Sequence, residues 1–115
     1  MPTILYDYPV CMAALSRKKP TDPRFAERFE VYVGDTELGN AFSELTDAAE
    51  QRRRFEYDMD LKEKLYGERY PIDDDFINAV AAMPEAAGIA IGVDRLVMLV
   101  AGVTRIEDAM WAPVA

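Results

Sequence analysis

The strongest constraint on the fold lies near the C-terminus, in residues 88–95, which read GIAIGVDR. Small residues alternate there with β-branched ones, and alternate side chains of a strand point to opposite faces of a sheet. The pattern predicts a strand with one apolar, buried face: Ile89, Ile91 and Val93. The other face is nearly bare backbone, on which a flat ligand could lie: Gly88, Ala90 and Gly92.

Arg95 stands at an unusual position for a cation. Residues 94–102, DRLVMLVAG, read as a short buried helix that ends at a glycine. Arg95 falls in the first turn of this helix, where the helix dipole disfavours positive charge. An anionic ligand at the helix start would compensate, because the free backbone N–H groups and the guanidinium would both face it. The alternative is a structural role, in which Arg95 pairs with a nearby carboxylate.

Composition limits the classes of function. A chain of 115 residues is one domain at most, and its net charge of −8 without a basic patch disfavours independent binding to nucleic acid. The absence of histidine excludes Ser-His-Asp and Cys-His catalysis and the usual zinc sites. The single cysteine, Cys11, excludes an internal disulfide and fits a reducing compartment. With no membrane-spanning run and no signal peptide, a cytoplasmic protein that does not enter the membrane is expected.

The order of elements predicts an α+β fold with an antiparallel sheet flanked by helices. Strands are expected at residues 3–8, 28–33, 36–45 and 87–93, and helices at about 47–66, 73–82 and 94–101. Asp47 and Thr104 each stand three residues before a glutamate, which is the pattern of a capping box at a helix start. Gly67 is expected to end the first helix.

The segment 28–45 predicts a β-hairpin that carries acidic residues. Gly34-Asp35 is a two-residue turn signal, which pairs Tyr32 with Glu37 and Glu30 with Gly39. Glu30 and Glu37 then share one face as diagonal neighbours about 7–8 Å apart. Two carboxylates at that spacing can hold one magnesium ion together with substrate phosphates. The alternative is a pair of solvated glutamates on an exposed face.

Three further residues of the second strand lie on the opposite face from Glu37 if alternation is strict: Asn40, Phe42 and Glu44. A glycine inside a strand often marks a β-bulge, which adds one residue and reverses the faces that follow. A bulge at Gly39 would therefore bring all three residues to the face of Glu37. The alternative for Phe42 is an ordinary place in the core.

Three segments together resemble one family: ERFEVY at 27–32, ELGNAFSEL at 37–45 and GIAIGVDRLVML at 88–99. They resemble the C-terminal part of the class II lysyl-tRNA synthetase catalytic domain, and the last resembles the third signature motif of that class. The resemblance covers residues 1–115 and implies a partial class II catalytic fold. The first and second signature motifs and the anticodon-binding barrel have no match in this sequence.

The resemblance implies a site for ATP, magnesium and lysine. Arg95 matches the arginine on the γ-phosphate of ATP, and Glu30 and Glu37 match the carboxylates that hold Mg2+ on the phosphates. Arg95 and Glu37 are accordingly the expected catalytic residues. The nucleotide is expected on four residues: Gly88, Gly92, Asp94 and Arg95. The amino acid is expected on four others, with the Glu44 carboxylate meeting the ammonium group of lysine: Asn40, Phe42, Glu44 and Ala90.

Details of the sequence are more similar to a truncated paralogous family than to the synthetases. Ala90 and Thr46 stand where synthetases usually have glycine and asparagine. The paralogues are the elongation factor P–lysine ligases, which transfer an activated lysine or β-lysine to a lysine of a protein. The alternatives are a fragment of a lysyl-tRNA synthetase, with tRNA as acceptor, and a non-catalytic remnant that binds a partner or dimerises. The complete protein is expected to be a homodimer.

Overall fold

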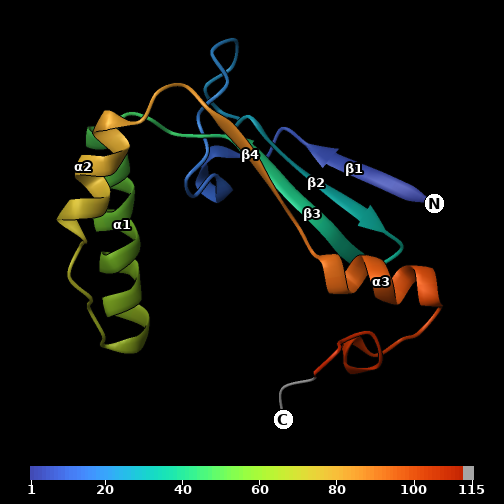
Figure 1. The fold of residues 1–115 in the computed structure, drawn as a ribbon. Coiled ribbons are helices and arrows are strands. Elements are labelled where there is room, and N and C mark those ends of the chain that lie inside the picture. Colours follow the sequence, from blue (N-terminus) through green and yellow to red (C-terminus); the bar gives the residue numbers. More distant parts are fainter. Residues whose placement is uncertain (113–115) are drawn as a thin grey trace.

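A computed structural model describes residues 1–112 of the chain (Figure 1). The strands are β1 (Pro2–Tyr6), β2 (Arg28–Val33), β3 (Thr36–Ser43) and β4 (Ala87–Ile91). The helices are α1 (Ala48–Tyr66), α2 (Asp74–Ala82) and α3 (Val93–Ala101), with short 3-10 turns at Val10–Met12 and Ile106–Asp108. The last three residues of the expected domain, 113–115, lie outside the described residues.

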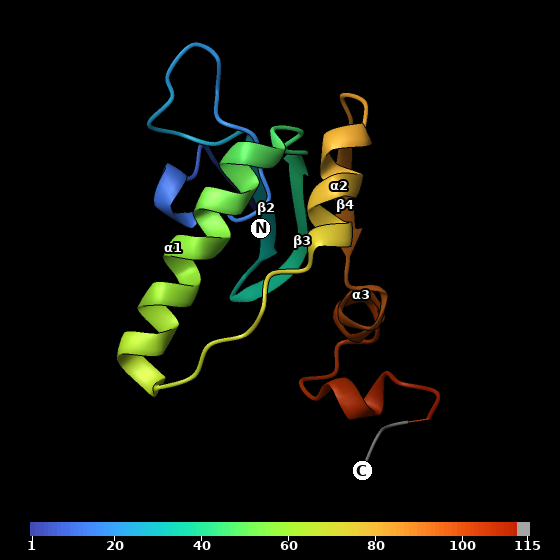
Figure 2. The same cartoon turned by 90° about the vertical axis from the view of Figure 1, so that its left-hand side faces the viewer.

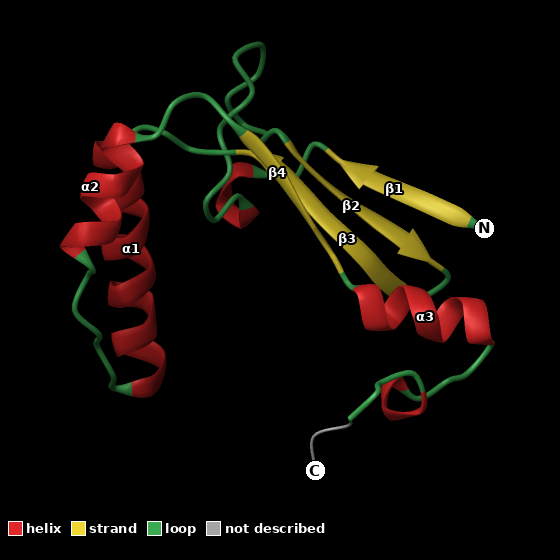
Figure 3. Cartoon of the chain, viewed as in Figure 1, coloured by secondary structure: helices red, strands yellow, loops and turns green. Residues whose placement is uncertain are grey.

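The sheet is antiparallel throughout, in the order β1-β2-β3-β4 (Figure 3). The predicted hairpin is therefore confirmed as β2–β3, and the strand predicted at 87–93 is confirmed as its neighbour β4. It ends at Ile91, however, because Gly92 and Val93 already begin α3. Each pair of neighbouring strands is antiparallel, so the sheet needs no crossover helix on its faces. The predicted α+β class is confirmed.

The helices lie at the two ends of the sheet (Figures 1 and 2). Helices α1 and α2 run side by side beyond one end, and the rings of Phe55 and Phe76 meet between them with centroids 5.7 Å apart. Helix α3 follows β4 directly at the other end. The two helical parts therefore leave broad areas of both sheet faces uncovered.

The core is small and sits where the loop after β1 and the first two helices meet the sheet. Its buried apolar side chains are Ala13, Ala26, Ala41, Leu45, Ile77 and Val80. Three of these are alanines, so they remove little apolar area from water. Much of the hydrophobic surface of the described chain consequently remains exposed.

The helix ends follow most of the expected local rules. The Asp47 carboxylate accepts a hydrogen bond from the Glu50 backbone N–H at 3.0 Å, so it caps α1 as predicted. Gly67 ends α1 in the left-handed region with φ 70°, where a side chain would be strained. The capping prediction for Thr104 is wrong, because the short turn there begins after Arg105 and has no side-chain cap.

The burial expected around β4 and α3 is wrong for the described residues. Ile89 and Ile91 are each 53% exposed, and Val93 is 65% exposed. The physical reason is position, since β4 is an edge strand and no described element packs over these side chains. Helix α3 contacts only β3 and the 3-10 turn at Ile106–Asp108 among the described elements, and its Val100 is 82% exposed. Among the described residues, no helix combines the length and the apolar character needed to cross a membrane.

Candidate functional site

The hairpin contains a β-bulge next to Gly39, where one was predicted. Tyr32 pairs with Glu37 as expected, but Val31 pairs with Gly39, which leaves Leu38 as the extra residue. Glu30 therefore faces Asn40, and its expected pairing with Gly39 in an unbroken ladder is wrong. A Cβ on Gly39 would stand 3.4 Å from the Ala90 carbonyl oxygen, so β4 approaches closely at the bulge.

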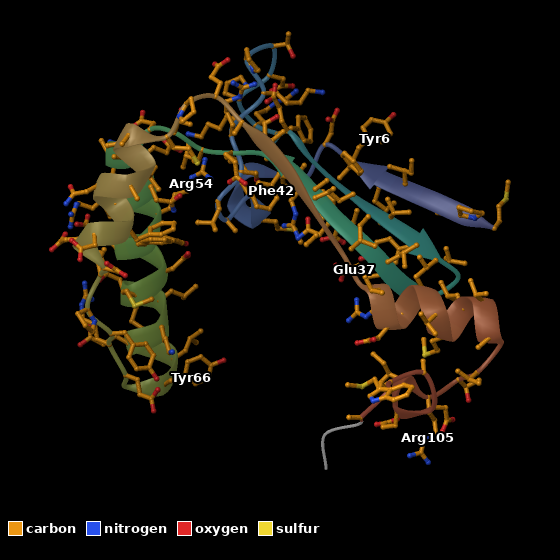
Figure 4. The ribbon with its side chains drawn as sticks, in the orientation of Figure 1. Tyr6, Glu37, Phe42, Arg54, Tyr66 and Arg105 are labelled. Atoms are coloured by element: carbon orange, nitrogen blue, oxygen red, sulfur yellow. The ribbon has the colours of Figure 1, made fainter. Side chains whose placement is uncertain are left out.

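The bulge gathers most of the expected site residues on one face of the sheet. We call it the polar face, and cross-strand pairing assigns to it Arg28, Glu30, Tyr32, Glu37, Asn40, Phe42, Gly88 and Ala90. Figure 4 shows Glu37 and Phe42 on this side and Tyr6 on the other. Glu44 reaches the same region, because a Cβ on Gly88 would lie 3.6 Å from Glu44 Oε1.

Arg95 and Glu37 form the part of the site nearest to α3. Arg95 Nη1 donates a hydrogen bond to the Glu37 backbone carbonyl at 2.7 Å and lies 4.0 Å from Glu37 Oε2. Their side chains are 46% and 40% exposed, and both line an open cleft of about 550 Å³. The pairing of Arg95 with a carboxylate is thus loose, and the guanidinium keeps donors for another partner. Gly88, Ala90 and Glu30 do not line this cleft.

Gly92 links the bulge to the arginine. Its backbone N–H donates to the Leu38 carbonyl at 2.9 Å, and the residue is the N-cap of α3. A Cβ on Gly92 would stand 3.1 Å from Arg95 Cδ, so the arginine side chain folds closely over this glycine. Asp94 lies exposed in the first turn of α3, where the helix dipole favours an acid.

Glu30 is buried, and its carboxylate accepts hydrogen bonds from three donors. Tyr8 and Tyr32 donate their hydroxyl hydrogens to Oε2 at 2.7 and 2.5 Å, and Arg28 Nη2 donates to Oε1. The hydrogen bond from Tyr32, with those from Tyr8 and Arg28, holds the pKa of Glu30 below its usual value. Burial and the hydrogen bond to Glu30 raise the pKa of Tyr8.

Arg28 is a site residue that the sequence reasoning missed. Its guanidinium also donates to Asn40 Oδ1 at 3.1 Å and to the Met12 carbonyl at 2.6 Å, and it lies 4.6 Å from the centre of the Tyr8 ring. It therefore joins two expected site residues, Glu30 and Asn40. The alternation of residues 28, 30 and 32 on one face could have indicated it.

A magnesium ion at Glu37 and Glu30 would need further ligands from a substrate. No group of three acidic, cysteine or histidine side chains is placed to hold a metal among residues 1–112. Magnesium, however, commonly binds one or two carboxylates together with substrate phosphates. Glu37 is half-exposed. A carboxylate can accept about four hydrogen bonds, and at Glu30 three of these positions are occupied by Tyr8, Tyr32 and Arg28.

A family model described as tRNA synthetases class II (D, K and N) matches residues 1–114. The chain belongs to the class II tRNA synthetase family. Among class II relatives, the elongation factor P–(R)-β-lysine ligase of Proteus mirabilis is 48% identical over 98% of this chain. The lysine–tRNA ligases of Halalkalibacterium halodurans and Bacillus subtilis are each 42% identical over 97% of it.

The class II relatives are considerably longer than this chain. It spans 35% of the Proteus mirabilis protein and 23% of each of the two lysine–tRNA ligases. The resemblance seen in the sequence is thereby confirmed at the level of the family, and these three relatives are lysine–tRNA ligases and an elongation factor P–(R)-β-lysine ligase.

Proposed function

We propose that this chain forms part of the site at which a ligase activates lysine or β-lysine with ATP, for transfer to a lysine of elongation factor P. The observation that carries the proposal is the bulge at Leu38 and Gly39, because it brings Glu37 onto the face of Asn40 and Phe42. The Proteus mirabilis relative supports the choice of acceptor. The intact protein would act in the cytoplasm as a homodimer.

The nucleotide would lie between α3 and the polar face. Its adenosine would rest on the backbone of Gly88 and Ala90 and beside Gly92, over which the Arg95 side chain folds. Its γ-phosphate would meet the free donors of Arg95, and the N–H groups at the start of α3 favour an anion nearby. Glu37 and the open acceptor position of Glu30 would hold magnesium, which neutralises phosphate charge when it is bound.

The reaction is a transfer of adenylate to a carboxylate. A carboxylate oxygen of the amino acid forms a bond to the α-phosphorus of ATP, while the bond from this phosphorus to the bridging oxygen breaks. The electron pair of that bond leaves with pyrophosphate, and the product is an aminoacyl-adenylate. This chain would contribute positioning and charge neutralisation, which need neither histidine nor cysteine.

The amino acid would lie beyond the nucleotide on the polar face. The Glu44 carboxylate would accept hydrogen bonds from the side-chain ammonium, and Phe42 would pack against the aliphatic stem. Asn40 is oriented by its hydrogen bond from Arg28, so its amide nitrogen is free to donate to the substrate. Of these three residues, only Glu44 would make a charged contact with the amino acid, through the side-chain ammonium.

A lysyl-tRNA synthetase is the second candidate, with tRNA in place of elongation factor P as acceptor. It is favoured by several lysine–tRNA ligases that are 42–44% identical to this chain. Both candidates share the activation step. Incubating the intact protein with ATP, labelled lysine and each acceptor in turn separates them, because label would move to elongation factor P in one case and to tRNA in the other.

Lysine-dependent exchange between ATP and pyrophosphate tests the activation step on the intact protein. Glu44→Gln should abolish the exchange and largely spare ATP binding, because the lost charge touches only the amino acid. Arg95→Ala should weaken ATP binding about 10-fold or more, the usual consequence of losing a charged hydrogen bond.

Glu56→Gln is a suitable control for the nucleotide measurement, because Glu56 is an exposed acid on α1 and does not line this cleft. It should leave ATP affinity nearly unchanged. Exchange at the wild-type rate in Glu44→Gln, or unchanged ATP affinity in Arg95→Ala, would contradict the proposed roles.

A further inference from the structure

A second cavity lies behind the expected amino acid pocket. It has a volume of about 270 Å³ and separates the end of β3 from helices α1 and α2. Most of its lining is apolar: Leu15, Leu45, Phe76, Ala79, Val80 and Met83. Two polar side chains complete the lining, and they come from opposite sides: Glu44 and Gln51.

Gln51 is the unusual member of this lining. It lies in the second turn of α1, is 1% exposed and is among the largest fully buried side chains of the described residues. Its Nε2 has no hydrogen-bond partner among residues 1–112. Burying an amide group without a partner costs free energy, and an apolar residue of similar size would fill the space without this cost. A buried donor of this kind therefore indicates a polar partner in the cavity.

Glu44 is the acceptor that the cavity offers. Its carboxylate also reaches toward Gly88 on the polar face, so it forms the boundary between the cavity and the expected amino acid pocket. No direct hydrogen bond joins Gln51 to Glu44 among the bonds of the described residues. The cavity is large enough for an ordered water, which needs about 10–15 Å³ and two to four polar partners.

We propose that Gln51 is a positioning residue for Glu44, acting from behind the pocket through a water that bridges Gln51 Nε2 to the carboxylate. The bridge would fix the carboxylate in the orientation that meets the substrate ammonium. It would also reduce the freedom that the side chain must lose when lysine binds. The inference rests on the proposed role of Glu44 and adds to it a residue that does not touch substrate.

Gln51→Met tests the bridge, because methionine matches the length of glutamine and removes the donor. In the intact protein we expect the KM for lysine to rise about 10-fold, in the range for losing a hydrogen bond to a charged group, with the KM for ATP unchanged. The Tm should change little, because methionine fills the same space and the lost hydrogen bond is one to a water. Gln51→Glu should raise the KM for lysine further, since it places a second acid behind Glu44.

Two comparisons distinguish this role from a purely structural one. Ile77→Val, in the same buried region, should lower the Tm and leave the KM for lysine unchanged. If Gln51→Met lowers the Tm and leaves the KM for lysine unchanged, the proposed water bridge is wrong and Gln51 contributes only to the stability of the fold. If Gln51→Met does not fold, the KM of Gln51→Leu decides the question in the same way.

The outcome for Gln51 is separable from the outcome for the proposed function. Loss of exchange in Glu44→Gln with no change in Gln51→Met would retain the amino acid pocket and reject the bridge. Wild-type exchange in Glu44→Gln would reject the pocket, and with it the reason for positioning Glu44.

Discussion

Glu50 shows how individual charges hold the loop after β1 against α1. Its carboxylate lies 2.8 Å from Lys18 Nζ and 3.1 Å from nitrogens of Arg53 and Arg54. Arg54 also donates to the Ala14 and Ser16 carbonyls at 2.9 and 2.8 Å. The three arginines at residues 52–54 therefore all form ion pairs within the chain.

These contacts predict a dependence of stability on pH. The hydrogen bond from Lys18, with those from Arg54 and Arg53, lowers the pKa of Glu50 to about 2 in the folded chain. In the unfolded chain the pKa of Glu50 should be near the ordinary glutamate value of about 4.3, so the unfolded state binds the proton more readily. The stabilisation is present above that value and is lost as the pH falls toward 2. The free energy of unfolding, measured by urea titration, should decrease over this range.

Two variants check the assignment to this residue. Glu50→Gln should flatten the decrease in the free energy of unfolding between about pH 4.3 and 2. Glu56→Gln, an exposed glutamate on the same helix, should retain it. An unchanged slope in Glu50→Gln would assign the acid sensitivity to other groups.

At the scale of the elements, local rules decided where helices begin and end. Asp47 caps α1, Asp73 caps α2, and Gly67 and Gly102 end α1 and α3 with φ of 70°. The reciprocal half of the Asp47 capping box is absent among the described bonds, because the Glu50 carboxylate contacts Lys18, Arg53 and Arg54 instead. The tertiary contacts of Glu50 thus replace a local one.

The cap at Asp47 is expected to have a measurable effect on stability. Asp47→Ala should lower the free energy of unfolding by about 1 kcal/mol, because the Glu50 N–H loses its side-chain acceptor. Asp47→Ser should restore most of this loss. Asp58→Ala, the same change at an exposed position within α1, should cause no loss because alanine has the higher helix propensity. Equal effects of the two alanine variants, measured by thermal unfolding, would rule out a capping contribution.

At the scale of the whole molecule, the face of the sheet opposite the polar face is uncovered. Cross-strand pairing places on it Ile4, Tyr6, Phe29, Ala41, Ile89 and Ile91. Most of these side chains are at least one-third exposed, and a shallow cavity of about 480 Å³ includes Tyr6, Phe29 and Ile89. An apolar face beside the open edge of β4 favours association with other surfaces.

The 115-residue chain is therefore expected to self-associate as its concentration rises. Replacing Ile89 and Ile91 with threonine keeps the β-branched shape of the strand and reduces its apolar surface. The double variant should bind less hydrophobic dye and sediment as a smaller species, with a change in Tm of only a few degrees because both side chains are half-exposed. Ala81→Thr, at an exposed position on α2, should change neither measurement. Self-association equal to wild type in the double variant would contradict the role of this face.

The sequence by itself determined the elements and one feature of tertiary geometry. Helix starts, glycine stops and the Gly34 turn depend on contacts within a few residues, so local patterns were sufficient to place them. The bulge could also be predicted, because the family resemblance implies that Glu37 and Glu44 serve one site. Residues an odd number apart share a face only if the ladder is interrupted. The positions of the expected site residues on one face follow from this parity.

Only the tertiary structure decided which groups meet across the chain. The donors to Glu30 come from β2 and from Tyr8 in the loop after β1, and the cavity joins Glu44 to Gln51 on a helix. The burial of Ile89 was mispredicted because alternation shows which residues share a face, whereas burial depends on whether another element covers that face. Alternation can be seen in the sequence of one strand, whereas the burial of a face depends on the other elements that pack against that strand.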